Sequence, residues 1–526
     1  MARVFSGFHQ SFLIKVSDLA MRRFSLALFL VLGMTCTNSM PAAARDLAVV
    51  KPVMDCGALA KMVLNQPEFQ GRVESAVLTS EEAPPPKMLA NMTTAVKSAH
   101  PFCNVKGYLT PQVHFELHLP MENWTQRLVF EGCGGLCGSV MLFGIFGGDN
   151  CQPVADGEFA TVTSDLGHST QKLTNMDAVW AADKQLRVDF GHRGVHVTTL
   201  AAKQIVERFY GRPQAFAYFD GCSDGGREAM VSVERYPADF NGVIAGAPVL
   251  NEVANNTIYH AWGVQRLINP DGKKVFSDAA IETLHKAVIA ACGTVTGDSK
   301  VNLVLDPTKC HYDPSAIACK GSEKADSCLT SDQVKAAHEL YVGPHDPEGH
   351  LLYYGYDYGS ELLWNREADG DASWGPGSFP GYLASDPPDP TAEFRKQVFT
   401  RDAVKKNNVF ANDLNALDTD LHPFQRAGGK LIIWQGWGDI AVATMPTVNF
   451  YHALRERFGP QTGDFVRLYM LPGVAHCGGG EGPDKMDLMA TIMKWTEDGI
   501  APGPMNVVKK DPSGAVTAKE VIEPYL

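Results

Sequence analysis

The sequence predicts an α/β fold in which a mostly parallel sheet carries helices on both faces and a large insertion divides the sheet into two parts. Three observations support this prediction. Short β-rich runs end in glycine turns, segments with helical periodicity alternate with these runs, and the alternation stops near residue 250 and resumes near residue 426. Such alternation is typical of parallel sheets that are covered by helices on both sides.

The first half of the sheet is predicted from its strand and helix patterns. Two apolar runs lead into the glycine-containing sequences Glu131–Gly138 and Ser164–His168, as strands do when they end in loops. Apolar residues spaced by three and four positions indicate helices between later strands. The predicted elements are strands at 128–130, 159–163 and 215–219 and helices at 195–209 and 227–235.

The segment 251–425 differs from its surroundings. It carries four cysteines, many Pro and Gly turns and scattered Trp and Tyr, with weak strand-helix alternation. We expect it to form a lid that packs on the sheet. The sheet pattern then resumes with strands at 428–434 and 465–470 and helices near 447–457 and 485–497. The predicted core is therefore split into residues 45–250 and 426–526.

The first 44 residues resemble a signal peptide. Met21-Arg22-Arg23 precedes a largely apolar run of about 11 residues and a small-residue cleavage site that ends at Ala44, and Met21 is a plausible start. The apolar run is too short to span a bilayer, which takes about 20 helical residues. We therefore expect a secreted or periplasmic protein without a membrane span, which keeps eleven of the twelve cysteines.

The charge of the chain limits the possible partners. Its 46 Lys and Arg against 59 Asp and Glu give a formal charge of −13 over 526 residues. No long basic run occurs, which argues against a nucleic-acid partner, because binding to a polyanion needs a basic face. The HExxH motif of zinc hydrolases is also missing, so we expect no catalytic metal.

Three sequence positions carry the chemistry of a serine hydrolase. Gly221-Cys222-Ser223-Asp224-Gly225 fits the nucleophile motif G-x-S-x-G and lies between a predicted strand and a predicted helix. Asp439 and His476 each follow a later predicted strand. Nucleophile, acid and base come in the order of α/β-hydrolases, at the strand ends where open sheets place their sites. The sequence therefore predicts a catalytic triad of Ser223, Asp439 and His476.

Two cysteines adjoin this predicted triad. Cys222 precedes the nucleophile and Cys477 follows the base, so a hydrogen bond between Ser223 and His476 brings their neighbours within bridging distance. In the chain-entropy model a disulfide that closes such a long loop is worth on the order of 5 kcal/mol. The alternative is a pair of buried thiols, which an exported protein makes less common.

These motifs together resemble the tannase and feruloyl esterase family. The resemblance rests on the Cys-Ser, Asp and His-Cys elements in this order, on Gly225–Glu228 after the nucleophile and on the long insertion. It implies an α/β-hydrolase fold and hydrolysis of gallate or hydroxycinnamate esters. Bacterial hydrolysis of mono(2-hydroxyethyl) terephthalate also occurs in this family, so terephthalate monoesters are an alternative substrate. An exported serine peptidase is a second alternative from the triad alone.

The resemblance also implies roles for single residues. Ser223 would attack the ester carbonyl, His476 would carry the proton and Asp439 would orient the imidazole. Of the two backbone N–H donors for the oxyanion, Asp224 follows from the geometry of the nucleophile turn, and Cys133 in the early glycine-rich loop follows by similarity. The plain alternative for that loop is a glycine turn. Further pairings expected from the family frame are Cys292–Cys310, Cys319–Cys328 and Cys56–Cys103, which leaves Cys133, Cys137 and Cys151 as one pair and one odd thiol.

Calcium and substrate contacts are less well marked. Family members often carry an acidic calcium loop in the insertion, but here Gly293, Thr296 and Lys300 or Val301 stand where acids are expected, with only Asp298 and Asp306 nearby. A hard cation needs about six to eight oxygen ligands, so we expect no calcium and no catalytic cofactor. The expected partner is a small neutral phenolic ester. Residues that could contact it are Trp262, Trp364, Trp374 and Tyr382, and Arg366 or Arg395 could meet a carboxylate.

Overall fold

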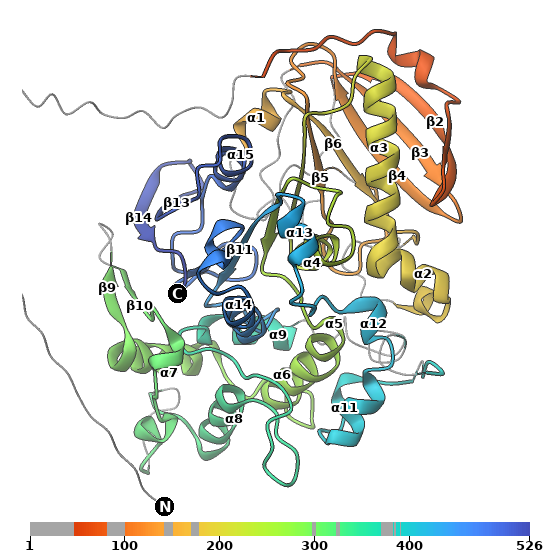
Figure 1. The fold of residues 1–526 in the computed structure, drawn as a ribbon. Helices are drawn as coiled ribbons and strands as arrows, with labels where there is room; N and C mark the ends of the chain where they lie inside the picture. The colour runs from red at the N-terminus through yellow and green to blue at the C-terminus, as the bar shows by residue number, and fades with distance from the viewer. Residues whose placement is uncertain are drawn as a thin grey trace, which may run out of the picture. The chain divides into compact units, whose positions relative to one another are not determined.

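A ten-stranded mixed sheet organises the part of the chain that the structure describes (Figure 1). Its strand order is β1-β2-β3-β4-β6-β5-β7-β8-β11-β12. The strands are β1 (Val63–Gln66), β2 (Phe69–Thr79), β3 (Phe102–Leu109), β4 (Val113–Pro120), β5 (Arg127–Glu131), β6 (Phe159–Ser164), β7 (Phe216–Cys222), β8 (Gly242–Gly246), β11 (Lys430–Gly436) and β12 (Val466–Leu471).

The structure is a computed structural model that describes most of the chain after residue 46. The predicted leader, residues 1–44 with Met21, lies outside the described residues. Contacts join Ala43–Leu526 into one compact unit. The described ranges are 47–80, 100–140, 142, 151–169, 178–296, 301–321, 327–369, 382, 386–389 and 391–526.

The sheet has a parallel and an antiparallel part. Strands β6, β5, β7, β8, β11 and β12 pair in parallel, which confirms the predicted α/β class. Strands β1 to β4 pair in antiparallel fashion, and β4 joins β6 in the same way. The sequence patterns above did not predict this antiparallel extension. Its strand β4 alternates buried and more exposed residues, as a strand does when only one face packs on a core.

Helices pack on both faces of the parallel part. Phe219 and Phe130 lie in one apolar cluster with residues of α3 (Gly194–Tyr210), α4 (Asp224–Arg235) and α14 (Met445–Phe458). Their neighbours in sequence, Tyr218 and Val129, lie in a second cluster with residues of α15 (Leu488–Asp498). Because successive side chains of a strand point to opposite faces, these two clusters are the two cores of the sheet. The predicted covering of both faces is therefore observed.

The segment 251–425 adds no strand to the ten-stranded sheet among its described residues. It builds a third apolar cluster with its own helices, and Ile440 and Ala443 from the core join that cluster. Its elements are α5 (Glu252–Ala254), the π-helix η4 (Asn255–Tyr259), α6 (His260–Leu267), α7 (Asp278–Cys292), β9 (Thr294–Thr296), β10 (Val301–Leu303), η5 (Pro307–Lys309), η6 (Pro314–Ile317), α8 (Ser331–Val342), η7 (Glu361–Leu363), α9 (Trp364–Asp369), η9 (Phe394–Lys396), α11 (Arg401–Asn407), α12 (Ala411–Leu414) and α13 (His422–Arg426).

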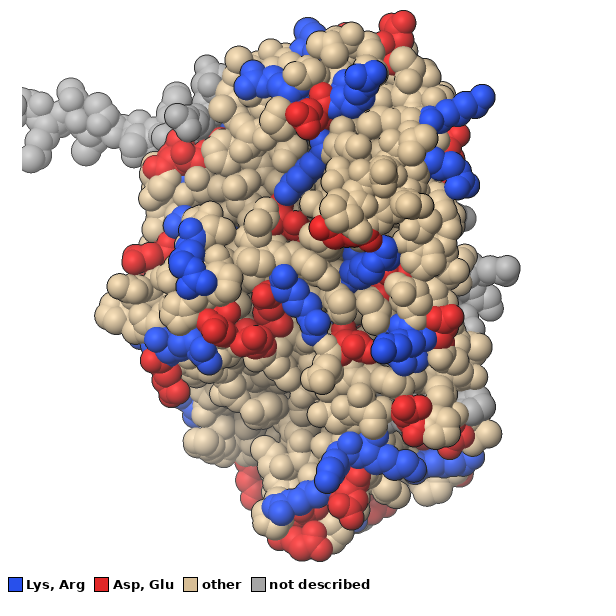
Figure 2. All heavy atoms as spheres, turned by 45° about the vertical axis from the view of Figure 1, so that its right-hand side comes forward, with Lys and Arg blue, Asp and Glu red and all other residues tan. Residues whose placement is uncertain are grey.

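Short helices and a hairpin complete the described fold. Within the described ranges, we find no helix with the length and apolar character that a bilayer crossing requires. On the face that Figure 2 displays, basic and acidic side chains are interspersed, so this face carries a mixed rather than a one-signed charge. The remaining elements are η1 (Cys56–Leu59), α1 (Gln152–Ala155), η2 (Val179–Ala182), α2 (Lys184–Val188), η3 (Asp189–Arg193), η10 (Gly459–Asp464), β13 (Met505–Lys510) and β14 (Val516–Ile522).

Candidate active site

Ser223 lies at a sharp turn between β7 and α4. Its backbone has φ 68° and ψ −121°, a conformation that a residue with a side chain adopts only under strain. The turn is tight enough that a Cβ on Gly221 would come within 2.7 Å of the backbone of Gly225. The predicted strand, turn and helix are therefore present, and the turn needs glycines on both sides of the serine.

The acid and the base approach Ser223 from the ends of β11 and β12. His476 Nε2 lies 2.8 Å from Ser223 Oγ, and His476 Nδ1 lies 2.9 Å from Asp439 Oδ2. Asp439 is 1% exposed, whereas Ser223 and His476 are partly accessible. The three predicted residues thus form one hydrogen-bonded line, with the acid in the interior and the hydroxyl at its accessible end.

The loop that carries Asp439 is fixed by its own backbone and by the insertion. Asp439 Oδ1 accepts the N–H groups of Ala441 and Val442 at 2.9 and 3.0 Å. Asn255 in the π-helix η4 accepts from the Ala443 N–H at 3.1 Å and donates to the Ala441 carbonyl at 2.9 Å. Sequence reasoning missed Asn255, although single turns of π-helix are frequent at functional sites.

Disulfides connect several of the predicted cysteine pairs. The sulfur atoms of Cys222 and Cys477 are 2.04 Å apart, so the two loops that carry Ser223 and His476 are covalently joined. Of the three cysteines that were left over, Cys133 and Cys137 form a disulfide, and buried Cys151 lies outside the five pairs. The other disulfides are Cys56–Cys103, Cys292–Cys310 and Cys319–Cys328.

The two expected oxyanion donors differ in their surroundings. Asp224 is the first residue of α4. Its N–H is therefore one of the first-turn N–H groups that have no hydrogen-bond partner within the helix. The Cys133 N–H donates instead to Glu228 Oε1 at 3.0 Å. An amide carries one hydrogen, and in this structure the N–H of Cys133 is directed at the buried Glu228 carboxyl. The role of Cys133 as the second oxyanion donor stays a prediction.

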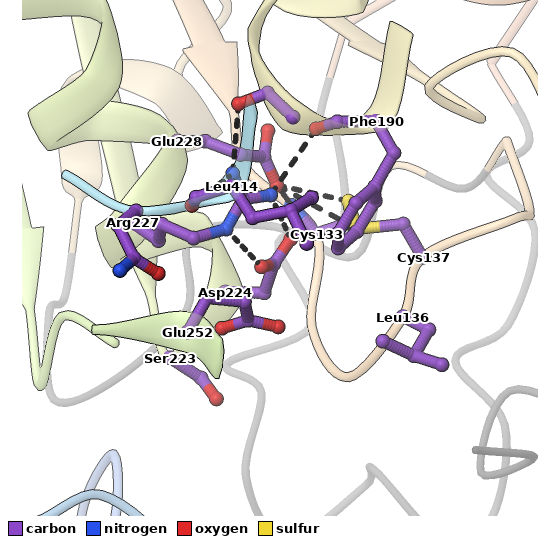
Figure 3. A network of polar contacts seen from close by, with 12 residues as sticks. Cys133, Leu136, Cys137, Phe190, Ser223, Asp224, Arg227, Glu228, Glu252 and Leu414 are labelled. Carbon is purple, nitrogen blue, oxygen red and sulfur yellow. Dashed lines mark hydrogen bonds and ion pairs between the residues drawn. A yellow bond between two sulfur atoms is a disulfide. The ribbon is translucent and has the colours of Figure 1, made fainter. Parts of the chain in front are cut away.

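A buried charge network lies directly behind the nucleophile turn (Figure 3). Arg227 is fully buried and donates to Asp224 Oδ1 at 2.6 Å and to the carbonyls of Gly191 and Phe190 at 2.8 and 3.1 Å. Glu228 is 2% exposed, and its Oε1 lies 2.9 Å from Cys133 Sγ. The network was not predicted, because its buried charges look like ordinary surface residues of a helix in the sequence.

Burial sets the protonation of this network. Burial raises the pKa of Glu228 well above its usual range, and the nearby Asp224 carboxylate raises it further, while Arg227 and the Cys133 N–H act in the opposite direction. Burial and Asp224 likewise raise the pKa of Glu252, against the effect of Arg227. Burial therefore favours the neutral form of Glu228 and of Glu252, and Arg227 favours the charged form of each.

Two groups of side chains have the spacing of metal ligands among the described residues. The first is Cys133, Cys137, Asp224 and Glu228, but its two sulfur atoms form a disulfide. The second is Asp346, Glu348 and His350 on a surface turn, where Arg401 pairs with Asp346 at 3.1 Å. Of the two acids considered for calcium, Asp306 caps a turn and pairs with Lys309 at 2.9 Å, and Asp298 lies outside the described residues.

The residues considered for substrate contacts are spread over the insertion. Trp364 is fully buried and Trp262 is 7% exposed, and both belong to the third apolar cluster, so they pack the insertion itself. Tyr382 packs against the first cluster. Arg366 and Arg395 are exposed, and Trp374 lies outside the described residues.

The parallel sheet, the strained serine turn and the acid and base loops define this chain as an α/β-hydrolase. A family model described as tannase and feruloyl esterase matches residues 94–524. The chain therefore belongs to the tannase and feruloyl esterase family, and it is a carboxylic ester hydrolase.

Individual relatives agree with this assignment. The chain is 32% identical over 450 residues to mono(2-hydroxyethyl) terephthalate hydrolase of Piscinibacter sakaiensis, and the alignment covers 74% of each protein. It is 28% identical over 454 residues to a probable feruloyl esterase B-1 of Aspergillus terreus, and the alignment covers 78% of this chain and 79% of that protein. The crystal structure of feruloyl esterase B from Aspergillus oryzae superposes with a TM-score of 0.72 at 23% identity over 88% of this chain and 93% of that one, which supports the fold.

Proposed function

We propose that this protein hydrolyses aromatic carboxylic esters through a Ser223 acyl-enzyme. His476 Nε2 takes the proton of Ser223 Oγ as the oxygen attacks the ester carbonyl, and returns it to the leaving alcohol. Water then attacks the acyl-enzyme, with His476 as base, and the carboxylic acid leaves. Asp439 holds the ring in the tautomer that exposes Nε2 and stabilises the imidazolium.

The observation that carries the proposal is the hydrogen-bonded line Asp439–His476–Ser223 at 2.9 and 2.8 Å, with a strained serine at its accessible end. The tetrahedral oxyanion would be stabilised by the Asp224 N–H and by an N–H of the loop after β5. Gly134 is the first amide of that loop beyond Cys133, and a Cβ on Gly134 would meet open space. One such donor is typically worth about 3 kcal/mol of the barrier.

We propose gallate or hydroxycinnamate esters as the substrate class, because the feruloyl esterases among the relatives are named for such a substrate. Terephthalate monoesters are the second candidate, favoured by the 32% identity to the terephthalate monoester hydrolase. We further propose export from the cytoplasm, which five disulfides support because such bonds persist in oxidising compartments.

The mechanism is tested by Ser223→Ala. We expect a loss of methyl ferulate hydrolysis on the order of 10⁴-fold or more with an unchanged melting temperature, because the variant lacks only the attacking oxygen. Ser232→Ala is the matched control, since Ser232 is a buried serine of the same helix that donates to the Glu228 carbonyl at 2.8 Å. Wild-type rates in Ser223→Ala would overturn the mechanism.

The substrate class is tested with a panel of methyl gallate, methyl ferulate, mono(2-hydroxyethyl) terephthalate and a peptide anilide. We expect the highest kcat/KM for one of the two phenolic esters. A preference for the terephthalate monoester would replace the proposed class by the second candidate. Cleavage of the anilide as the preferred substrate would point to a peptidase and contradict the proposal.

A further inference from the structure

We propose that Glu228 is a positioning residue for the oxyanion site: its buried carboxyl, on helix α4, fixes the loop 132–138 against the turn that carries the nucleophile. The inference rests on the proposed function, because it concerns where the loop places its N–H groups. Glu228 would touch no substrate atom. Its effect would pass through Cys133 to the amides that follow it.

Glu228 holds the loop at its entry. The Cys133 N–H donates to Glu228 Oε1 at 3.0 Å, and the same oxygen lies 2.9 Å from Cys133 Sγ and 3.6 Å from Cys137 Sγ. Figure 3 shows the carboxyl of Glu228 directed at the Cys133 end of the loop. One oxygen thus contacts the Cys133 amide, the second of the loop, and both sulfur atoms of the disulfide that closes it.

The loop and the helix are in close backbone contact at this point. A Cβ on Gly132 would lie 2.7 Å from Gly225 Cα, and a Cβ on Gly225 would lie 2.9 Å from the Cys133 carbonyl oxygen. Such an approach leaves no room for an intervening side chain. The loop therefore rests on the first turn of α4, and the contact to Glu228 determines how its backbone is turned on that surface.

The two expected oxyanion donors depend on this contact for their separation. Asp224 and Glu228 are four residues apart on α4, about one helical turn, so they form one rigid unit. The Asp224 N–H is carried by this unit, and the loop N–H groups are tied to it through Glu228 and Cys133. A shift of the loop of about 1 Å would misalign the second donor, and misplacements of that size are costly in catalysis.

The far side of the loop has a second anchor. His168, in the turn after β6, donates from Nε2 to the Leu136 carbonyl at 2.7 Å. His168 is 3% exposed and stacks on Trp180 with ring centroids 3.8 Å apart. The loop is thus held at Cys133 from α4 and at Leu136 from the neighbouring strand end, as expected for a segment whose amides need fixed positions.

The protonation of Glu228 determines which substitution should preserve its role. Burial, followed by repulsion from Asp224, raises the pKa of Glu228 well above the usual range of a carboxyl and so favours its uncharged form. Its carboxyl also shares a hydrogen bond with the Asp224 side chain. A glutamine is nearly the same size, keeps the acceptor for the Cys133 N–H and is uncharged, so it should replace Glu228.

The test compares Glu228→Gln with Glu228→Met, which fills the space but cannot accept the Cys133 N–H. We expect kcat for methyl ferulate within about threefold of wild type in Glu228→Gln, and about 10- to 100-fold lower in Glu228→Met with KM changed less than about threefold. Unchanged kcat in Glu228→Met would overturn the inference. An equal loss of kcat in both variants would also overturn it, because catalysis would then depend on the charge of Glu228 and not on its hydrogen bond to the loop.

Two further variants keep the test conclusive. If Glu228→Met does not fold, Glu228→Asp retains the acid but shortens its reach, and the same loss of kcat is expected from it, with unchanged kcat as the contrary result. Glu497→Gln disturbs a buried carboxylate that bonds Arg127 at the other end of β5, so it should lower stability and leave kcat unchanged. Failure of the proposed function would appear separately, as a wild-type protein without ester hydrolysis.

Discussion

Two buried charge clusters lie at opposite ends of the central parallel strands, and they are built differently. At the start of β5, Arg127 donates twice to Glu497, at 2.8 and 2.7 Å, and once to Glu158 at 3.3 Å. Behind the nucleophile turn, Arg227 faces Asp224, Glu228 and Glu252. The first cluster shares its guanidinium between a fully buried and a partly exposed acid, and the second holds three buried carboxyls against one cation.

The difference shows where the fold tolerates poorly satisfied groups. Glu497 accepts Arg127 through both oxygens and also accepts the Tyr218 hydroxyl at 2.6 Å. By contrast, Oε2 of Glu252 is buried without a hydrogen bond among the described residues, and the Glu228 carboxyl shares its side-chain hydrogen bond with another acid, Asp224. Natural proteins accept such costs mainly near functional sites. The unbalanced cluster adjoins Ser223, as this rule predicts.

Removing the cation from each cluster should give the largest effect and separate their roles. Arg227→Met leaves the Asp224 carboxylate buried without its partner, and Arg127→Met does the same to Glu497, so each should lose about 3–5 kcal/mol of unfolding free energy. Only Arg227→Met should also lower kcat, by about 100-fold, because Asp224 carries one of the two proposed oxyanion N–H groups. Urea unfolding and ester hydrolysis measure the two quantities. A comparable loss of kcat in Arg127→Met would remove the distinction.

Two disulfides, one at the candidate site and one far from it, allow the same comparison of stability and kcat, with a somewhat smaller expected loss of kcat. The Cys222–Cys477 bond joins residues 255 positions apart, and Cys56–Cys103 joins residues 47 positions apart at the antiparallel end of the sheet. In the chain-entropy model, loss of Cys56–Cys103 should cost about 4 kcal/mol and loss of Cys222–Cys477 about 5 kcal/mol. Replacing Cys222 and Cys477 by Ala should also reduce kcat about tenfold, because the bond holds the base loop against the nucleophile turn. An equal reduction of kcat in the Cys56 and Cys103 double variant would contradict this role.

The sequence predicted the parallel half of the fold because its signals are local. Strands 128–130 and 215–219 and helix 195–209 match β5, β7 and α3 within three residues, since buried parallel strands read as continuous apolar runs. The antiparallel strands β1 to β4 were missed. Their half-exposed pattern is a weaker signal than a continuous apolar run, although β1 and β2, and likewise β3 and β4, pair as hairpins between neighbouring segments.

The candidate site shows the same limit. Ser223, Asp439 and His476 could be predicted because motif and order place them at strand ends. Asn255 and Glu228 could not, because their roles depend on contacts with Ala443 and Cys133 that only the folded chain creates. For the same reason, similarity identified the loop that carries Cys133 but not the hydrogen bond that its N–H makes with Glu228.

A histidine between the insertion and the base loop tests the coupling of these regions through pH. His285 Nδ1 lies 2.7 Å from Glu361 and Nε2 lies 3.0 Å from Glu481, five residues after His476. Burial opposes its charge, but hydrogen bonds to both acids outweigh burial and raise the pKa of His285 from 6.5 to about 9.

A raised histidine pKa stabilises the folded state fully below the unfolded pKa of 6.5, and this contribution is lost as pH rises through about 9. It amounts to about 2–3 kcal/mol. We expect wild type to exceed His285→Gln in urea stability at pH 6 and the difference to shrink steadily up to pH 10. A difference that does not change with pH would show that the charge of His285 is not what stabilises the contact.

The smallest change in unfolding free energy should come from Glu252→Gln. We expect a gain in stability, because the cluster behind the nucleophile turn holds three carboxyls against one cation. Burial, with Asp224 next in size, raises the pKa of Glu252 above its usual 4.5, so the folded protein holds a proton that the unfolded chain releases at neutral pH. Folded stability of wild type therefore falls as pH rises above about 4.5, and a glutamine removes this cost. We expect Glu252→Gln to be more stable by about 1 kcal/mol at pH 8, with the gain vanishing near pH 4. A destabilised variant at pH 8 would mean that the Glu252 carboxyl is ionised and satisfied, as Glu497 is, and the two clusters would then differ less than their contacts indicate.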